Sequence, residues 1–209
     1  MAKSYQQYCP IAHALDTVGE RWSLLIVREL IHGPQRYTDL LDRLEGCGTN
    51  ILAARLRHLE ASGVVQKRKL PPPAASTVYE LTEYGAGLRN CLRELAWWGA
   101  RSLGPPSEAD LEAGWLGGAL ETIGPAPGTA PAVEFRIGEE TAGWVDGDVV
   151  HGSLADPDLV VEGDPAGFYY LLIERRTDGL RIDGDLADVE RLLDAIGAPT
   201  DAAAATPAA

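Results

Sequence analysis

The chain has 209 residues, a hydrophobic fraction of 45% and a formal net charge of −13. This length fits one large domain or two small ones, and the hydrophobic fraction is ordinary for a globular protein. No apolar run approaches the roughly 20 residues that cross a bilayer, and the first ten residues lack a secretory signal, so we expect neither a membrane span nor export. Three widely spaced cysteines favour a reducing, cytoplasmic setting over a disulfide framework.

The charge is distributed very unevenly along the chain. Residues 1–103 hold 13 Lys and Arg against 10 Asp and Glu, a net charge of +3, whereas residues 104–209 carry a net charge of −16. Only the first part is therefore suited to a polyanionic partner. The Gly- and Pro-bearing segment 104–110 is predicted to link a first domain, 1–103, to a second, 111–197, and a disordered tail is expected over 198–209.

Hydrophobic periodicity predicts a defined order of elements in the first domain. Four helices are followed by a β-hairpin with a proline-rich tip and by a last helix that Thr82 caps. A helix, a short Gly-bearing turn, a second helix and a hairpin are typical of a winged helix-turn-helix domain, which is mainly α. The predicted helices cover 9–19, 21–33, 37–45, 49–63 and 82–103, and the predicted strands cover 64–69 and 77–81.

The fourth predicted helix is a candidate recognition helix. Leu52, Leu56 and Leu59 fall within about 40° on a helical wheel and form its buried stripe. Thr49 is predicted as the N-cap, and with Asn50 it lies at the helix N-terminus, where the dipole favours phosphate. Asn can read adenine and Arg can read guanine, although an ordinary amphipathic surface helix explains the pattern equally well. The side predicted to face outward holds Asn50, Ala54, Arg57, His58 and Ala61.

Basic residues gather in the predicted hairpin beside this helix. Lys67, Arg68 and Lys69 run into the proline-stiffened loop, and strand alternation puts Lys67 and Lys69 on one face and Arg68 on the other. Next to a recognition helix, such a run suits a clamp on the DNA backbone. A solvated charge run is the alternative interpretation.

Short motifs are spread over about residues 5–101. They are Cys9-Pro10, Gly19-x-Arg21-Trp22, Gly33-Pro34-x-Arg36-Tyr37, Arg55-Leu56-x-x-Leu59-Glu60, Pro72-Pro73, Tyr79-x-Leu81-Thr82-Glu83-x-Gly85 and Trp98-Gly99. With them the segment resembles the HxlR-type regulators, a branch related to the MarR group. The resemblance implies a homodimer that binds a pseudo-palindromic operator in double-stranded DNA, usually as a repressor or autoregulator, with terminal helices at the dimer interface. One departure is Ala53, where many members have Ser facing DNA.

The resemblance and the helical spacing together give the expected site residues. Cys9 matches a position that is a thiol switch in some relatives, and the alternative is a small buried residue that seats the first helix. The apolar stripe Leu88, Leu92, Leu95 and Trp98 is the expected dimer interface. The expected DNA-binding residues are Arg36, Thr49, Asn50, Ala53, Ala54, Arg57, Lys67, Arg68 and Lys69.

The acidic second half is predicted to be an α+β layer with an antiparallel sheet. A helix over 111–124 precedes strand-like segments within 132–163, and a helix opened by Asp164-Pro165 precedes a strand over 180–185 and a helix over 185–197. The segment 111–197 resembles a sterol-carrier-protein-like domain, which implies an apolar cavity for a lipid-like molecule. Core packing is the alternative role for each aromatic residue. Those expected to contact the ligand are Trp115, Trp144, Phe168, Tyr169 and Tyr170.

Nothing in the sequence singles out a catalytic group. The four histidines lack metal-ligand spacing, and there is no Gly-x-Ser-x-Gly, phosphate loop or dinucleotide fingerprint. We therefore expect no enzyme activity, metal or cofactor. The leading hypothesis is a dimeric DNA-binding transcriptional regulator that responds to a hydrophobic small molecule. The alternatives are a carrier or enzyme domain tethered to a DNA-binding module, a thiol-switch regulator acting through Cys9, and an interaction module whose acidic half recruits partners.

Overall fold

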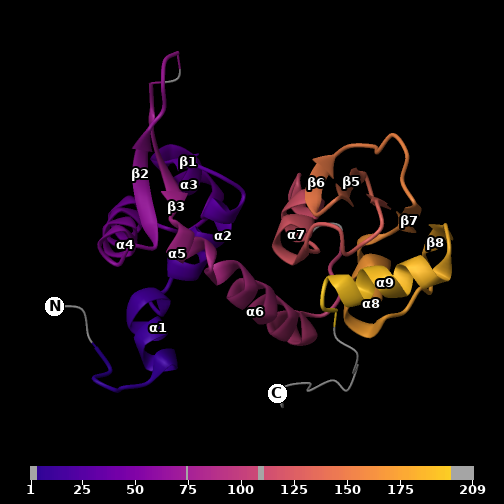
Figure 1. The fold of residues 1–209 in the computed structure, drawn as a ribbon, viewed down its shortest axis with the longest axis horizontal. Coiled ribbons are helices and arrows are strands. Elements are labelled where there is room, and N and C mark those ends of the chain that lie inside the picture. The colour runs from indigo at the N-terminus through magenta and orange to yellow at the C-terminus, as the bar shows by residue number, and fades with distance from the viewer. Residues whose placement is uncertain (1–3, 74, 108–110, 199–209) are drawn as a thin grey trace. The chain divides into compact units, whose positions relative to one another are not determined.

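A computed structural model describes residues 4–73, 75–107 and 111–198 of the chain (Figure 1). The chain divides into two compact units, Met1–Leu92 and Arg93–Ala209. The division falls inside helix α6, Leu88–Leu103, where Leu92 belongs to the core of the first unit and Trp97 to the core of the second.

Parts of two predicted segments lie outside the described residues. These are residues 108–110 of the predicted linker and residues 199–209 of the predicted tail. The domain boundary at 104–110 therefore stays a prediction.

The first unit contains the predicted helices and hairpin, together with one strand that the sequence did not predict. The short strand β1 pairs with β3, so the hairpin is part of a three-stranded antiparallel sheet in the order β1-β3-β2. The hairpin β2–β3 projects beyond the helices of its unit (Figure 1). The elements are α1 (Pro10–Val18), α2 (Ser23–Ile31), β1 (Gln35–Arg36), α3 (Tyr37–Arg43), α4 (Thr49–Ala61), β2 (Val65–Lys69), β3 (Thr77–Leu81), α5 (Glu83–Ala86) and the first part of α6.

Two predictions about helix ends are wrong. The N-cap of α4 is Gly48 rather than Thr49, because the Gly48 carbonyl accepts the first hydrogen bond of the helix, from Leu52 N at 3.0 Å. The predicted helix 82–103 is two helices, α5 and α6, which meet at Gly87. Thr82 does act as a cap, since its hydroxyl accepts a hydrogen bond from Gly85 N at 3.0 Å, but the helix it caps is the short α5.

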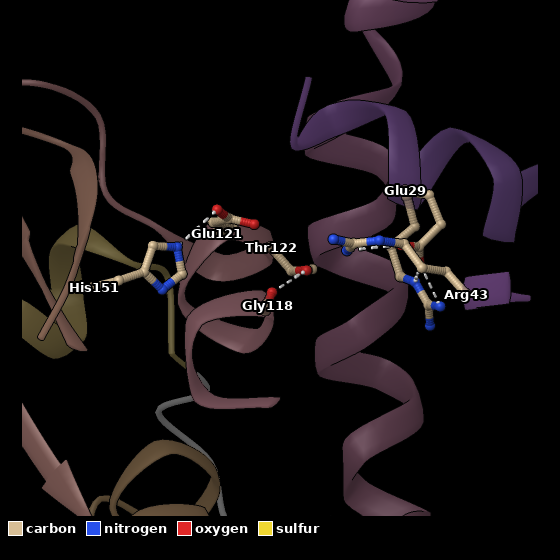
Figure 2. Close-up of polar contacts among 7 residues, drawn as sticks. Glu29, Arg43, Gly118, Glu121, Thr122 and His151 are labelled. Carbon is tan, nitrogen blue, oxygen red and sulfur yellow. Dashed lines mark hydrogen bonds and ion pairs between the residues drawn. The ribbon is translucent and has the colours of Figure 1, made fainter. Parts of the chain in front are cut away.

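A buried carboxylate joins α2 to α3 in the first unit. The Glu29 side chain is 7% exposed and lies 2.6 Å from Nη2 of Arg28 and 3.6 Å from Nη1 of Arg43 (Figure 2). A buried carboxylate is costly unless cations compensate it, and both guanidinium groups do so here.

The second unit is an α+β layer, as the sequence predicts. Two helices begin at aspartate caps, since Asp164 accepts a hydrogen bond from Gly167 N and Asp185 accepts one from Ala187 N. The first helix starts at Trp115, four residues later than predicted. The elements are α7 (Trp115–Ile123), β4 (Val133–Ile137), β5 (Glu140–Val145), β6 (Asp148–His151), β7 (Leu159–Gly163), α8 (Pro165–Glu174), β8 (Arg181–Asp183) and α9 (Leu186–Ala195).

The sheet of the second unit is mixed, so the prediction of an antiparallel sheet is wrong. Its strand order is β6-β5-β4-β7-β8, and the central strands β4 and β7 are parallel. Parallel pairing is possible here because a long connection that includes β5 and β6 joins β4 to β7, whereas a tight turn joins antiparallel strands. Val133, Phe135 and Ile137 of β4 belong to the hydrophobic core of the unit. The Phe135 ring meets the rings of Trp144 and Phe168 edge to face, each with centroids 5.3 Å apart.

Candidate nucleic-acid interface

Helix α4 has one buried side and one accessible side. Leu52, Leu56 and Leu59 are at most 1% exposed, which confirms the predicted stripe. Opposite them, Thr49, Asn50 and Arg57 are exposed, and the small residues Ala53 and Ala54 are half-buried. The Arg57 guanidinium donates from Nε to the Ala53 carbonyl at 3.2 Å, along its own helix. This side therefore offers amide and guanidinium donors beside small side chains that permit close approach.

Contacts from other segments fix α4 at both ends. The Tyr37 hydroxyl of α3 donates to the Thr49 carbonyl at 2.7 Å. Arg55 lies 3.5 Å from Glu20, and His58 Nε2 lies 3.0 Å from the Thr17 carbonyl. The prediction that His58 faces outward is therefore wrong, because its ring is directed to the end of α1.

The N-terminus of α4 is open to a ligand. Its cap, Gly48, supplies no side-chain oxygen, and the first turn has no acidic residue. Arg36 is exposed at the start of the neighbouring α3, where its backbone N–H donates to Asp39 Oδ2 at 3.1 Å. An exposed N-terminus of a 13-residue helix without an acidic first turn favours an anion.

The hairpin holds its basic residues as predicted, on alternate faces of β2. Lys67 pairs in register with Tyr79, and Arg68 pairs with Val78. Lys67 Nζ lies 2.7 Å from Glu60 Oε2 and 5.4 Å from the centre of the Tyr79 ring.

Carboxylates neutralise two of these three cations. Arg68 Nε lies 2.7 Å from Glu80 Oε2, and Lys67 contacts Glu60 as described. The hydrogen bond to Glu60 raises the pKa of Lys67, and the hydrogen bond from Arg68 lowers the pKa of Glu80, so both shifts favour the charged form of the group concerned. Lys69 is exposed and has no ion pair within the described residues.

The predicted dimer stripe divides into two parts. Leu88 and Leu92 pack into the core of the first unit, whereas Leu95 is 44% exposed and Trp98 is 72% exposed. The adjacent Trp97, which the sequence analysis did not single out, is the buried tryptophan of the pair at 5% exposed. Cys9 is half-buried and occupies the N-cap position of α1.

The five aromatic residues predicted to contact a ligand have different environments. Trp144 and Phe168 are buried in the core, at most 3% exposed. The Tyr169 hydroxyl donates to the Ala100 carbonyl at 2.9 Å, and Tyr170 lies against Arg176. Only Trp115, of these five, lines a cleft of about 490 Å³, and the other residues that line it are Leu111, Glu112, Ala113, Ile137, Gly138, Glu139, Glu140 and Pro165.

The second unit also contains one histidine–carboxylate contact. His151 Nε2 lies 3.7 Å from Glu121 Oε1, and the His151 side chain is 68% exposed (Figure 2). In residues 4–73, 75–107 and 111–198, no group of His, Cys, Asp or Glu has the arrangement of a metal site, and no helix is long and apolar enough to span a membrane.

Tyr37, Glu60 and Glu80 are site residues that sequence reasoning missed. Tyr37 belongs to a motif, but the motif does not say that its hydroxyl reaches Thr49. Glu60 and Glu80 lie 7 and 12 residues from their cations; the register of the hairpin brings Glu80 to Arg68, and the packing of α4 against β2 brings Glu60 to Lys67.

The geometry of the first unit defines a winged helix-turn-helix protein, and sequence comparison gives its family. Residues 17–106 match the HxlR-like helix-turn-helix family. An uncharacterized HTH-type transcriptional regulator of Synechocystis sp., sll1512, is 39% identical over 84 residues, which are 40% of this chain and 62% of that protein. The HTH-type transcriptional regulator YodB of Bacillus subtilis is 32% identical over 91 residues, 43% of this chain and 81% of YodB. The chain therefore belongs to the HxlR-like helix-turn-helix family.

The similarity is confined to part of the chain. The chain spans less than two thirds of sll1512, although it spans most of YodB. A solved structure of the reduced form of YodB from B. subtilis is 29% identical, covers 48% of this chain and 100% of that one, and has a TM-score of 0.42.

Replacing Tyr37 by Phe tests the contact that holds the start of α4. The change removes the donor to the Thr49 carbonyl, so we expect the free energy of unfolding of the first unit to fall by about 0.5–1.5 kcal/mol. Backbone amides in the first turn of α4 should exchange with solvent faster. Tyr84→Phe is the matched control, because Tyr84 is 64% exposed and its hydroxyl has no hydrogen bond within the described residues. Equal behaviour of the two variants would contradict the role of Tyr37.

Proposed function

We propose that this protein is a homodimeric, sequence-specific DNA-binding transcriptional regulator that represses transcription by occupying a pseudo-palindromic operator. The observation that carries the proposal is the accessible side of α4. Buried leucines fix the rotation of this helix. Its N-terminus is open, and Asn50 and Arg57 face outward. A basic hairpin follows the helix directly in the chain. These features suit a recognition helix in the major groove and a wing on the phosphate backbone. The names of its relatives as HTH-type transcriptional regulators support the same function.

Base readout is assigned to Asn50 and Arg57, with phosphate contacts from Arg36, Thr49 and Lys69. Asn donates to and accepts from adenine, and Arg donates to guanine or to phosphate. Ala53 and Ala54 let the helix approach the base edges, because a half-buried methyl group leaves space in the groove.

Arg57→Ala tests the orientation of α4. We expect operator affinity to fall by about 1–3 kcal/mol, which is roughly 5- to 150-fold, while the fold is retained. The measurement is a gel shift on a fragment with the promoter of the protein's own gene. Arg101→Ala removes the same charge from an exposed position of α6 and should leave affinity within about twofold. Unchanged binding by Arg57→Ala would show that this side of α4 does not face DNA.

The dimer part of the proposal rests on Leu95 and Trp98. Large apolar side chains left this exposed on one helix mark a surface that a partner covers. We propose a second copy of the chain as the partner, because the pseudo-palindromic operator proposed above would require two-fold symmetry.

Replacing each of two neighbouring tryptophans in turn distinguishes an effect on dimerisation from an effect on folding. Trp98→Ala should give a folded monomer at micromolar concentration by sedimentation, because the side chain contributes little to the core of its own chain. Trp97→Ala empties a buried position instead and should lower the free energy of unfolding of the second unit by about 3–5 kcal/mol. A folded dimer formed by Trp98→Ala would rule out this interface.

We further propose that the second unit binds a small molecule that changes operator affinity. The cleft beside Trp115 supports this, and its glutamates together with Ile137 and Pro165 favour an amphiphilic ligand over a purely apolar one. Fluorescence of the neutral dye Nile red should rise with the wild-type chain and with Trp115→Phe, and much less with Trp115→Ala. Equal enhancement by all three proteins would place the dye elsewhere. The sterol-carrier-like fold and a thiol switch at Cys9 stay predictions.

A further inference from the structure

The hairpin β2–β3 is the wing of this fold, and two carboxylates compete with phosphate for its basic side chains. Two carboxylates lie 2.7 Å from two of its three cations, Glu60 from Lys67 and Glu80 from Arg68. The Gln66 amide also donates to Glu80, at 3.0 Å, which holds this carboxylate in place beside the strand.

The two pairs are independent of each other. Glu60 is in the last turns of α4, whereas Glu80 is in β3. Because Lys67 and Arg68 are adjacent in β2, their side chains lie on opposite faces of the hairpin. One carboxylate therefore pairs with a cation on each face of the hairpin, and either carboxylate can be substituted without affecting the other pair.

The cation of each pair is accessible to a competing anion. The Lys67 and Glu60 side chains are 42% and 37% exposed, and those of Arg68 and Glu80 are 45% and 16% exposed. An exposed ion pair such as Lys67–Glu60 contributes little to stability, about 0–1 kcal/mol. A DNA phosphate can therefore replace the carboxylate as the partner of the cation, at a modest cost.

We propose that Glu60 and Glu80 limit the affinity of the wing for DNA by holding Lys67 and Arg68 in neutral pairs. This inference rests on the proposed DNA-binding function. A phosphate must displace the carboxylate or approach a pair of zero net charge, so each paired cation releases fewer DNA counterions than a free one. Lys69, with no ion pair among the described residues, contributes its full charge. The carboxylates thus lower the affinity of the wing for all DNA sequences alike, because phosphate contacts do not depend on the bases.

The experiment compares full-length Glu60→Gln and Glu80→Gln with the wild type. Binding is measured on the promoter fragment and on an unrelated duplex of equal length, between about 50 and 200 mM salt. Each variant should bind both DNAs more tightly by the same factor, about two- to fivefold. The slope of log affinity against log salt should become steeper by up to about 0.9.

Two controls separate this role from a change in net charge. Glu83→Gln removes an exposed carboxylate of α5 that has no ion pair in the described part of the chain, and its effect should be much smaller. In a Lys67→Gln background, Glu60→Gln should give no gain, because the cation that it frees is gone.

The outcomes distinguish this inference from the function on which it rests. If the wild type binds the promoter fragment no better than unrelated DNA, the proposed function fails before any variant is tested. If the wild type binds specifically but the glutamine variants keep its affinity and salt slope, or bind more weakly, the inference is overturned. Glu80→Asp keeps the charge but shortens the side chain, and it should give a smaller gain than Glu80→Gln. Thermal melting of each variant verifies the fold.

Discussion

Burial of Leu52, Leu56 and Leu59 is the interaction on which the candidate interface depends. An α-helix has only one rotation that places three such side chains in the core at once, and that rotation decides which residues face outward. Each of these leucines is worth roughly 1.5–3 kcal/mol in transfer from water, far more than any exposed polar contact of the helix. The outward position of Asn50 and Arg57 is therefore a consequence of core packing rather than of their own interactions.

Local patterns in the sequence predicted most of the elements, because helical and strand periodicity is a property of neighbouring residues. The leucine stripe, the alternation of the basic residues along their strand and the Thr82 cap follow from spacing alone. Strand β1 was missed because a two-residue strand has no periodicity, and its pairing partner lies more than 40 residues away. The parallel pairing of β4 with β7 was missed for the same reason, since the strand sequences do not specify their neighbours.

The polar contacts of the candidate site were less predictable than its buried side. His58 occupies an outward position on a helical wheel, yet the end of α1 lies within hydrogen-bonding distance of its ring. Trp97 and Trp98 are adjacent and chemically equal, and only the packed structure shows that one is buried and the other exposed. A wheel describes one helix by itself, whereas burial depends on what the rest of the chain places beside it.

The net charge of a segment is a poor guide to its attraction for DNA, because the distance between charges decides how strongly each acts. In physiological salt, the influence of a charge decays over about 8 Å, so the −16 of residues 104–209 acts on a bound phosphate only from groups within that range. Glu60 and Glu80 are 2.7 Å from their cations and are not screened from them by intervening ions. Two glutamates in contact can therefore outweigh a much larger remote charge. The basic run of the wing, which the sequence presents as three equivalent cations, is electrostatically two neutral pairs and one free lysine in the described structure.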